Sequence, residues 1–268
     1  ECEMMTLIMA ARLQLSGTEE ALRTCREAAA DFGRDRGARK ALAPRMKLLM
    51  SSLYMGKDPP AWEDAARACN EAINGFKDAG DNRSMGEALL HQMAVCRGTG
   101  DFTQALQSGE RAATIFQRSS DERMQAKVLL EQAKVQFDRL LSEVETDTTK
   151  ERENQYPVHH ITPDEVQRRA AEYLRLAERA ETLLRSIDDE QGVQEVRETI
   201  RAGFDRAVDF YKSVESPSQV VTYLDEDGRT VKRTEKLWNL DELVPSLQAA
   251  KEKANMKSEA ATTAAAAS

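Results

Sequence analysis

The side chains best able to do chemistry in this 268-residue chain are its three histidines and four cysteines. His91 precedes Cys96 by five residues, a spacing that does not bring two side chains onto one face of a helix, so the pair is not expected to bind a metal. His159 and His160 have neither a nearby cysteine nor an HExxH frame. We therefore expect no metal site, and we interpret His91 as a packing residue or a groove residue.

The cysteines indicate reduced thiols rather than a disulfide framework. Cys2, Cys25, Cys69 and Cys96 are too few for such a framework in a chain of this length, and no two of them form a CxxC pair. This usage is typical of an intracellular protein, either cytoplasmic or organellar. Because the chain begins at Glu1, we expect a processed protein or a part of a longer one, whose targeting segment is out of view.

The acidic run at residues 225–228 is the only segment that suggests a calcium loop, and it does not fit one. If Gly228 were the sixth loop position, the first and twelfth would be Tyr223 and Thr234, and neither can supply a carboxylate ligand. The chain also has no GxxxxGK[ST], GxGxxG or GxSxG motif. We therefore predict no catalytic residue, no cofactor and no enzymatic activity.

Composition favours a helical, acidic protein. The 38 Lys and Arg against 46 Asp and Glu give a net charge of −8, which argues against sequence-independent binding to nucleic acid. Ala, Glu, Arg and Leu dominate, and all four favour helices. No apolar run is long enough to span a membrane, although a membrane-bound partner complex remains compatible with the sequence.

One pattern of small and aromatic residues recurs along the first half of the chain. Ala21, Ala28 and Phe32 begin it, and the same spacing returns at offsets of 44 and then 40 residues. The later copies are Ala65, Ala72 and Phe76, and then Ala105, Ala112 and Phe116. Each repeat reads as two helices joined by a turn such as residues 98–101, where Gly supplies a left-handed C-cap and Asp an N-cap. Cys25 and Cys69 occupy equivalent positions, with Gly109 in the third copy, which indicates a site for small packing residues.

The chain resembles a tetratricopeptide-repeat (TPR) protein in the turn and second helix of the repeat, which it matches with Gly100, Asp101, Phe102, Ala105, Leu106 and Ala112. The period of 40 to 44 residues exceeds the family's usual value of about 34. It is similar to the long-helix variety of kinesin light chains and Leu-Gly-Asn-type scaffolds. The resemblance covers roughly residues 1–142. We call the recurring Ala, Ala and Phe the frame, together with the aspartate that follows five residues later in the second and third copies. A fourth copy of the frame follows at Tyr173, Ala180, Leu184 and Asp189.

This resemblance implies an all-α fold, a right-handed superhelical solenoid of about four helical hairpins plus a cap helix. We expect the solenoid over residues 1–214, with a charged insertion at about 143–162 that is either a loop or a helix extension followed by a loop. Thr162 and Pro163 are expected to start the next helix. The cap helix, at about 190–214, presents one apolar face: Val193, Val196, Ile200, Phe204, Ala207, Val208 and Tyr211.

A short C-terminal arm is expected over residues 215–256, followed by a low-complexity tail at 257–268. Residues 220–224 and 230–233 flank Asp227 and Gly228 and predict a β-hairpin. The arm is unusually apolar for a free tail, so it either folds back over the solenoid or docks on a second protein. We favour docking, through the candidate partner-binding residues Tyr223, Leu224, Trp238 and Leu240.

The TPR resemblance also implies a concave groove lined by the first helix of each pair. Twelve positions map to it, of which five are basic and one is acidic: Lys47, Met50, Tyr54, Lys57, Glu87, Leu90, Ala94, Arg97, Lys127, Leu130, Lys134 and Phe137. The candidate partner-binding residues among them are Lys47, Tyr54, Arg97, Lys127, Lys134 and Phe137. Such a basic bias favours an acidic partner segment, although lysines and arginines that merely solvate helix ends would give the same pattern. Only Lys127 matches the clamp of the chaperone-binding members, so capture of chaperone tails is not expected.

These patterns predict a non-catalytic scaffold for protein–protein interaction, a structural or assembly subunit of a larger complex. Two alternatives remain open. One is a regulatory or accessory helical domain of a longer enzyme, which a catalytic sequence outside residues 1–268 would reveal. The other is a transient adaptor that binds an acidic peptide segment.

Overall fold

The computed structural model describes residues 17–35, 41–152, 163–213, 218–224 and 230–236. The chain divides into two compact units, Glu1–Val135 and Gln136–Ser268.

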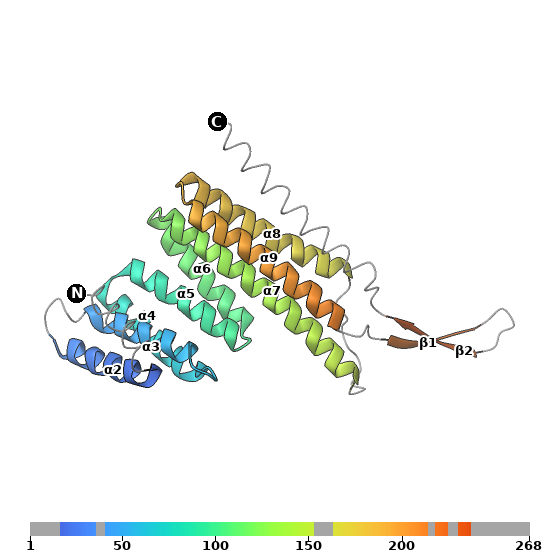
Figure 1. The fold of residues 1–268 in the computed structure, drawn as a ribbon, viewed down its shortest axis with the longest axis horizontal. Helices are drawn as coiled ribbons and strands as arrows, with labels where there is room; N and C mark the ends of the chain where they lie inside the picture. The colour runs from blue at the N-terminus through green and yellow to red at the C-terminus, as the bar shows by residue number, and fades with distance from the viewer. Residues whose placement is uncertain (1–16, 36–40, 153–162, 214–217, 225–229, 237–268) are drawn as a thin grey trace. The chain divides into compact units, whose positions relative to one another are not determined.

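The first unit consists of consecutive helices that pack pairwise. They are α2 (Thr18–Arg34), α3 (Ala43–Met55), α4 (Trp62–Ala79), α5 (Asn82–Gly98), α6 (Phe102–Arg118) and the first part of α7 (Glu122–Arg152) (Figure 1). Helix α3 packs against α2 and α4, and α5 packs against α4 and α6. The predicted all-α fold of repeated helical hairpins is therefore confirmed. The right-handed superhelix and the domain boundaries stay predictions.

The turns from α4 to α5, from α5 to α6 and from α6 to α7 share one geometry. A residue with positive φ ends the helix, and the aspartate that follows caps the next helix by accepting a backbone N–H three residues on. The pairs are Gly80 and Asp81, Gly100 and Asp101, Ser120 and Asp121, and, in the second unit, Asp188 and Asp189. Each of these aspartates also donates its own N–H to a carbonyl five residues back, at 2.9 or 3.0 Å, which satisfies the end of the preceding helix. The sequence predicted the Gly–Asp form of the turn, and the structure extends it to Ser120 and Asp188.

The recurring frame of small and aromatic residues forms the core of the first unit. Ala65, Ala72, Ala105 and Ala112 are all fully buried, and Phe116 is buried with them. Phe116 lies over Gly86, where an added Cβ would fall 2.7 Å from the ring. Small residues at the crossings therefore let successive helices approach closely around large rings. Cys25, Cys69 and Gly109 are buried, as expected of a site for small packing residues.

The second unit contains the rest of α7, then α8 (Pro163–Ser186) and α9 (Glu190–Ser213). Helix α7 runs through the first part of the predicted insertion, which is thus a helix extension as far as Arg152. Helix α8 begins at Pro163, as predicted. The fourth copy of the frame is present in it, because Tyr173, Ala180 and Leu184 are buried and Asp189 caps α9.

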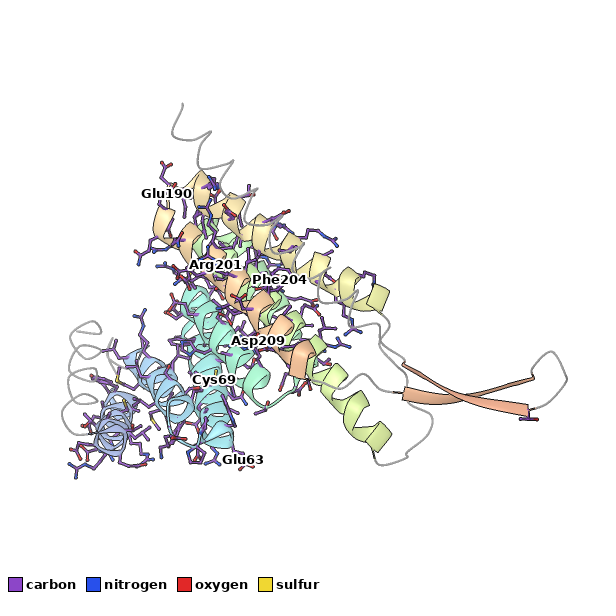
Figure 2. All side chains as sticks on the ribbon, turned by 45° about the vertical axis from the view of Figure 1, so that its right-hand side comes forward. Glu63, Cys69, Glu190, Arg201, Phe204 and Asp209 are labelled. Atoms are coloured by element: carbon purple, nitrogen blue, oxygen red, sulfur yellow. The ribbon has the colours of Figure 1, made fainter. Side chains whose placement is uncertain are left out.

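Helix α9 coincides with the predicted cap helix and has two unlike faces. Val193, Val196, Ile200 and Phe204 are buried on one face. The outward positions are charged and exposed, among them Glu190, Arg201 and Asp209, which Figure 2 labels together with Phe204. A polar outer face is what the end of a helical array requires. The other predicted apolar positions, Ala207, Val208 and Tyr211, have side chains outside the described set.

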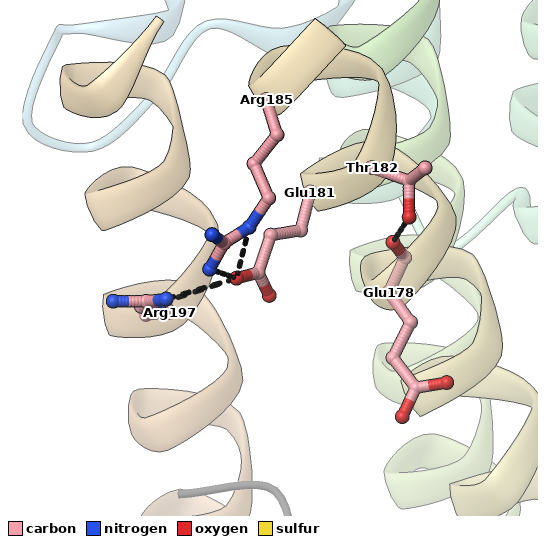
Figure 3. A network of polar contacts seen from close by, with 5 residues as sticks. All are labelled: Glu178, Glu181, Thr182, Arg185 and Arg197. Carbon is pink, nitrogen blue, oxygen red and sulfur yellow. Dashed lines mark hydrogen bonds and ion pairs between the residues drawn. The ribbon is translucent and has the colours of Figure 1, made fainter. Parts of the chain in front are cut away.

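A charged cluster joins α8 to α9 (Figure 3). One oxygen of the Glu181 carboxylate accepts from Arg185 on its own helix, at 2.6 Å, and from Arg197 on α9, at 3.0 Å. The three side chains are between 16 and 27% exposed, so water screens the attraction only in part. The cluster thus adds a charged contact between α8 and α9 to the burial of the apolar face of α9.

The arm contains the predicted hairpin. Strands β1 (Ser218–Leu224) and β2 (Thr230–Lys236) pair in antiparallel fashion, with Val221 opposite Arg233. The connecting residues 225–229, the part of the arm after Lys236 and the tail at 257–268 lie outside the described residues.

Candidate interaction surface

The first helices of the predicted pairs, α3, α5 and α7, bring together a polar cluster centred on His91. The hydroxyl of Ser52 on α3 lies 3.4 Å from Nδ1 of His91 on α5. Burial lowers the pKa of His91, and the charge of Glu131 on α7 acts in the opposite direction. Burial thus favours the neutral imidazole, and the Ser52 contact joins α5 to α3, in agreement with the interpretation of His91 as a packing residue.

Glu131 on α7 pairs with two cations, Arg97 on α5 and Lys134 on its own helix. Its carboxylate lies 3.9 Å from the Arg97 guanidinium and 2.7 Å from the Lys134 ammonium. Both cations keep about a quarter to a third of their side-chain surface in water, at 30% and 26%. Arg97 and Lys134 thus lie beside the same carboxylate.

Lys127 extends the same side of α7. It is exposed, and it stands four residues before Glu131 and seven before Lys134, a spacing that places all three on one helical face. The structure thus brings three predicted groove residues together, and we call Arg97, Lys127 and Lys134 the basic face. Whether this face binds a partner stays a prediction.

Lys47 and Tyr54, two further predicted groove residues, contact other helices of the chain. The Lys47 ammonium lies 2.6 Å from Glu71 on α4, so this side chain reaches toward the second helix of its pair. Tyr54 is only 7% exposed, and its hydroxyl accepts from Arg26 on α2 at 2.9 Å. Tyr54 therefore holds α2 against α3, and its ring is not available as a partner-binding surface.

Phe137 needs a correction, because it is a core residue of the second unit. Its side chain is 2% exposed, and its ring centroid lies 4.9 Å from that of Tyr173 and 6.3 Å from that of Phe204. These distances are typical of tilted and edge-to-face aromatic pairs. Phe137 was predicted to face a groove because it follows Lys134 by about one helical turn. In the structure, residues of α8 and α9 cover this side of α7.

Tyr173 completes this aromatic core, and its hydroxyl occupies the space beside Gly203. Its hydroxyl donates to the backbone carbonyl of Thr199 at 2.9 Å, and burial raises its pKa well above the ordinary value. A Cβ on Gly203 would fall 2.6 Å from that hydroxyl oxygen. The pairing of Tyr173 with Gly203 was not predicted, although the tyrosine at the alanine position of the repeat was a signal for it.

The arm residues named as partner-binding cannot be placed in detail. Tyr223 and Leu224 lie on β1, with Tyr223 opposite Val231, and their side chains are outside the described set. Trp238 and Leu240 lie outside the described residues.

The described side chains show no arrangement for metal binding or thiol chemistry. No group of three or more His, Cys, Asp or Glu that could hold a metal occurs among them. Burial raises the pKa of Cys25 to about 11, of Cys69 to about 12 and of Cys96 to about 11, so these thiols are protonated and poorly reactive. His159 and His160 lie outside the described residues.

Among the described helices, none combines the length and the apolar character needed to cross a bilayer.

No family model matches the chain, and no curated protein matches its sequence. Solved structures that are similar to it include the following two. BtubC (BKLC) from P. vanneervenii is 14% identical with a TM-score of 0.46, and the match covers 84% of this chain and 86% of that chain. A Podosopora anserina protein described as kinesin light chain nearly identical TPR-like repeats is 11% identical with a TM-score of 0.45, covering 76% of this chain and 95% of that chain. Identities this low assign the chain to no family, and its TPR-like character rests on its own hairpins, turns and buried frame.

Proposed function

We propose that the chain is a scaffold for protein–protein interaction, a structural or assembly subunit of a larger complex, and that its basic face binds an acidic segment of a partner. The observation that carries the proposal is that Arg97 and Lys134 both lie within ion-pair distance of Glu131, while Lys127 stands exposed on the same face of α7. This concentration of positive charge stands in a chain whose net charge is −8.

Electrostatics gives this face a preference among partners. A carboxylate brought near Arg97 and Lys134 shares their N–H donors with Glu131, and charge-assisted hydrogen bonds of this kind are among the stronger polar contacts. The cations remain partly in water, so bulk salt screens their long-range attraction. Binding should therefore be selective for acidic segments and weaken as salt is added.

A titration with a fluorescently labelled, glutamate-rich peptide tests this proposal. The triple variant Arg97→Glu, Lys127→Glu and Lys134→Glu should bind at least about tenfold more weakly, since about 1.4 kcal/mol of lost attraction is enough for that factor. It should retain the helicity of the wild type, although reversing Arg97 and Lys134 beside Glu131 replaces two ion pairs by like-charge contacts and should lower the melting temperature.

A matched control separates local from overall charge. Arg67, Arg111 and Arg118 are exposed on α4 and α6, and reversing these three changes the net charge by the same amount. Arg118 also matches Arg97 as a basic residue in the last turn of its helix. Equal loss of binding in both variants, or no binding by the wild type, would exclude the basic face as the peptide site.

The arm is proposed to dock on a second protein, with Trp238 as an aromatic anchor. An isolated two-stranded hairpin is marginally stable in water, so a free arm should be cut readily by proteases. Limited proteolysis of the dilute isolated chain should cleave between Val214 and Leu237, and the native assembly should be protected there. Protection of the isolated monomer would make the arm part of the fold instead.

A further inference from the structure

The two strands of the arm differ sharply in sequence. Strand β1 reads SQVVTYL and contains no charged residue, proline or glycine. Strand β2 reads TVKRTEK, and four of its seven residues are charged. Valine, threonine and tyrosine are also among the residues that favour strands most, so β1 is much the stronger strand former of the two.

The strands also differ in how their outer edges are protected. Within the described residues the sheet has only the order β1-β2, so each strand has one edge that no other described strand covers. Proteins commonly protect such edges with lysines and other charged residues, and β2 carries Lys232, Arg233 and Lys236. Strand β1 has no such protection and presents seven uncharged residues for pairing.

We propose that β1 of one chain pairs with β1 of a second copy, antiparallel across a two-fold axis, to give a four-stranded sheet in the order β2-β1-β1-β2. The register that pairs all seven residues places Val221 opposite Val221 and Val220 opposite Thr222. It also places Gln219 opposite Tyr223. Pairs of β-branched and aromatic residues stabilise antiparallel sheets, and no like charges face each other in this register.

The other self-pairings of the hairpin are worse. Pairing β2 with β2 in the equivalent register places Arg233 opposite Arg233, and like charges directly opposite are destabilising. Pairing β1 with the β2 of another copy leaves one free edge of each kind, so the contact does not close and would continue into a fibre. The β1–β1 arrangement is closed and leaves only the charged β2 edges outside.

Charge does not oppose this association. Residues 218–236 contain four acidic and four basic residues, so the hairpin is neutral, although the whole chain carries −8. The inference rests on the proposed docking role of the arm, and it specifies a second copy of the chain as the partner that binds at β1. It is independent of the basic face.

Disulfide trapping in the full chain tests the pairing directly. Residues opposite each other in antiparallel strands have Cα atoms about 4.5–5.5 Å apart, within the range of about 4.4–6.8 Å that a disulfide requires. In a Cys2→Ser background, Val221→Cys should give a reducible dimer under mild oxidation. The remaining native cysteines are buried and should not compete.

Arg233→Cys is the matched control, because Arg233 lies opposite Val221 in the hairpin but on the protected strand. It should remain monomeric in the same experiment. Equal trapping of the two variants, or no trapping of Val221→Cys, would overturn the proposed pairing. If the arm is then protected only by another protein, the docking proposal stands and the second copy is excluded as its partner.

Sedimentation equilibrium provides a measurement without cross-links. The wild type should show a concentration-dependent dimer, and Val221→Lys should raise its dissociation constant by at least about tenfold, because it replaces a favourable valine pair by two facing lysines. Val231→Lys adds the same charge to β2 and should leave the dimer within about threefold of the wild type. A wild type that stays monomeric at every concentration, or an equal effect of both lysines, would contradict the proposal.

Discussion

The two units of the chain use one residue frame with different contents. In the first unit the frame begins with a fully buried alanine, Ala65 or Ala105, and ends with a phenylalanine. In the second unit Tyr173 takes the place of the alanine, and Leu184 takes the place of the phenylalanine. The turn after the frame is nevertheless the same, with Asp121 and Asp189 as caps.

The comparison shows that both units have the same turn and the same spacing, whereas the aromatic ring stands at a different position of the frame. Tyr173 brings a ring and a hydroxyl into the second unit, and Gly203 on α9 provides the room for them. In the first unit Gly86 provides the room for Phe116 in the same manner. A large side chain and a facing glycine thus act as a pair, and the pair can shift from one helix to another without changing the hairpin.

The largest expected effect is the removal of a ring from the frame of the first unit. Phe116 is fully buried, so Phe116→Ala should cost about 3–5 kcal/mol of unfolding free energy, from lost burial and a residual cavity. Phe32 occupies the equivalent position in α2 but is only half-buried, so Phe32→Ala should cost clearly less. Denaturant unfolding followed by circular dichroism measures both, and equal costs would show that the frame is not in register.

The next effect tests the pairing of Tyr173 with Gly203 in the second unit. A Cβ placed 2.6 Å from the tyrosine oxygen overpacks the core, so Gly203→Ala should cost about 1–3 kcal/mol, in spite of alanine's better helix propensity. In a Tyr173→Phe background the nearest contact is gone, and the same change should cost less. A double-mutant cycle measures the coupling, and purely additive costs would contradict the pairing.

A smaller effect concerns the cap that both units share. Burial acts to raise the pKa of Asp81, but hydrogen bonds from the hydroxyl and amide of Ser84 and the charges of Arg45 and Arg83 outweigh it, so the pKa lies below its ordinary value. The stability that the carboxylate contributes is therefore present above the unfolded-state pKa and lost as the pH falls through the folded-state pKa.

Asp81→Ala should accordingly cost about 1 kcal/mol at neutral pH, the usual size of an N-cap. The gap to the wild type should shrink below about pH 4, where the carboxylate of unfolded chains becomes protonated. Unfolding titrations at several pH values measure this, and a gap that is constant with pH would contradict the assignment.

The smallest effect concerns His91. Its folded-state pKa is lowered by burial, so the folded state disfavours the protonated form, and the associated stability decreases as the pH falls below the unfolded-state value of about 6.5. The imidazole resonances should titrate below that value in NMR spectra. Glu131→Gln removes the charge that opposes this shift and should lower the pKa of His91 further. An unchanged or higher pKa would show that the charge of Glu131 does not act on His91.

The repeat could be predicted from sequence because its determinants are local. The spacing of Ala105, Ala112 and Phe116 predicts which face of the helix is buried. Gly100 and Asp101 indicate where one helix ends and the next begins. The fourth copy was found in the same way from Ala180 and Asp189.

The basic face could be predicted only in part, because its limits depend on which helix covers which side. Arg97, Lys127 and Lys134 share a face, but Phe137, one turn further along α7, is covered by α8 and α9. Charge partners were also beyond the sequence, since Lys47 could reach either α4 or a ligand, and only the packed structure shows Glu71 beside it. The surroundings of Phe137 and Lys47 depend on contacts between helices that are distant in sequence, and helical periodicity does not predict such contacts.

The central claim is that the chain works as an interaction scaffold through its basic face. Quantitative affinity purification of the full chain tests it most directly, with the wild type, the reversal of Arg97, Lys127 and Lys134, and the matched reversal of Arg67, Arg111 and Arg118 compared side by side. We predict a defined set of proteins that the wild type and the matched control both retain and that the basic-face variant loses. Retention of the same proteins by all three, or their loss from both variants alike, would contradict the claim.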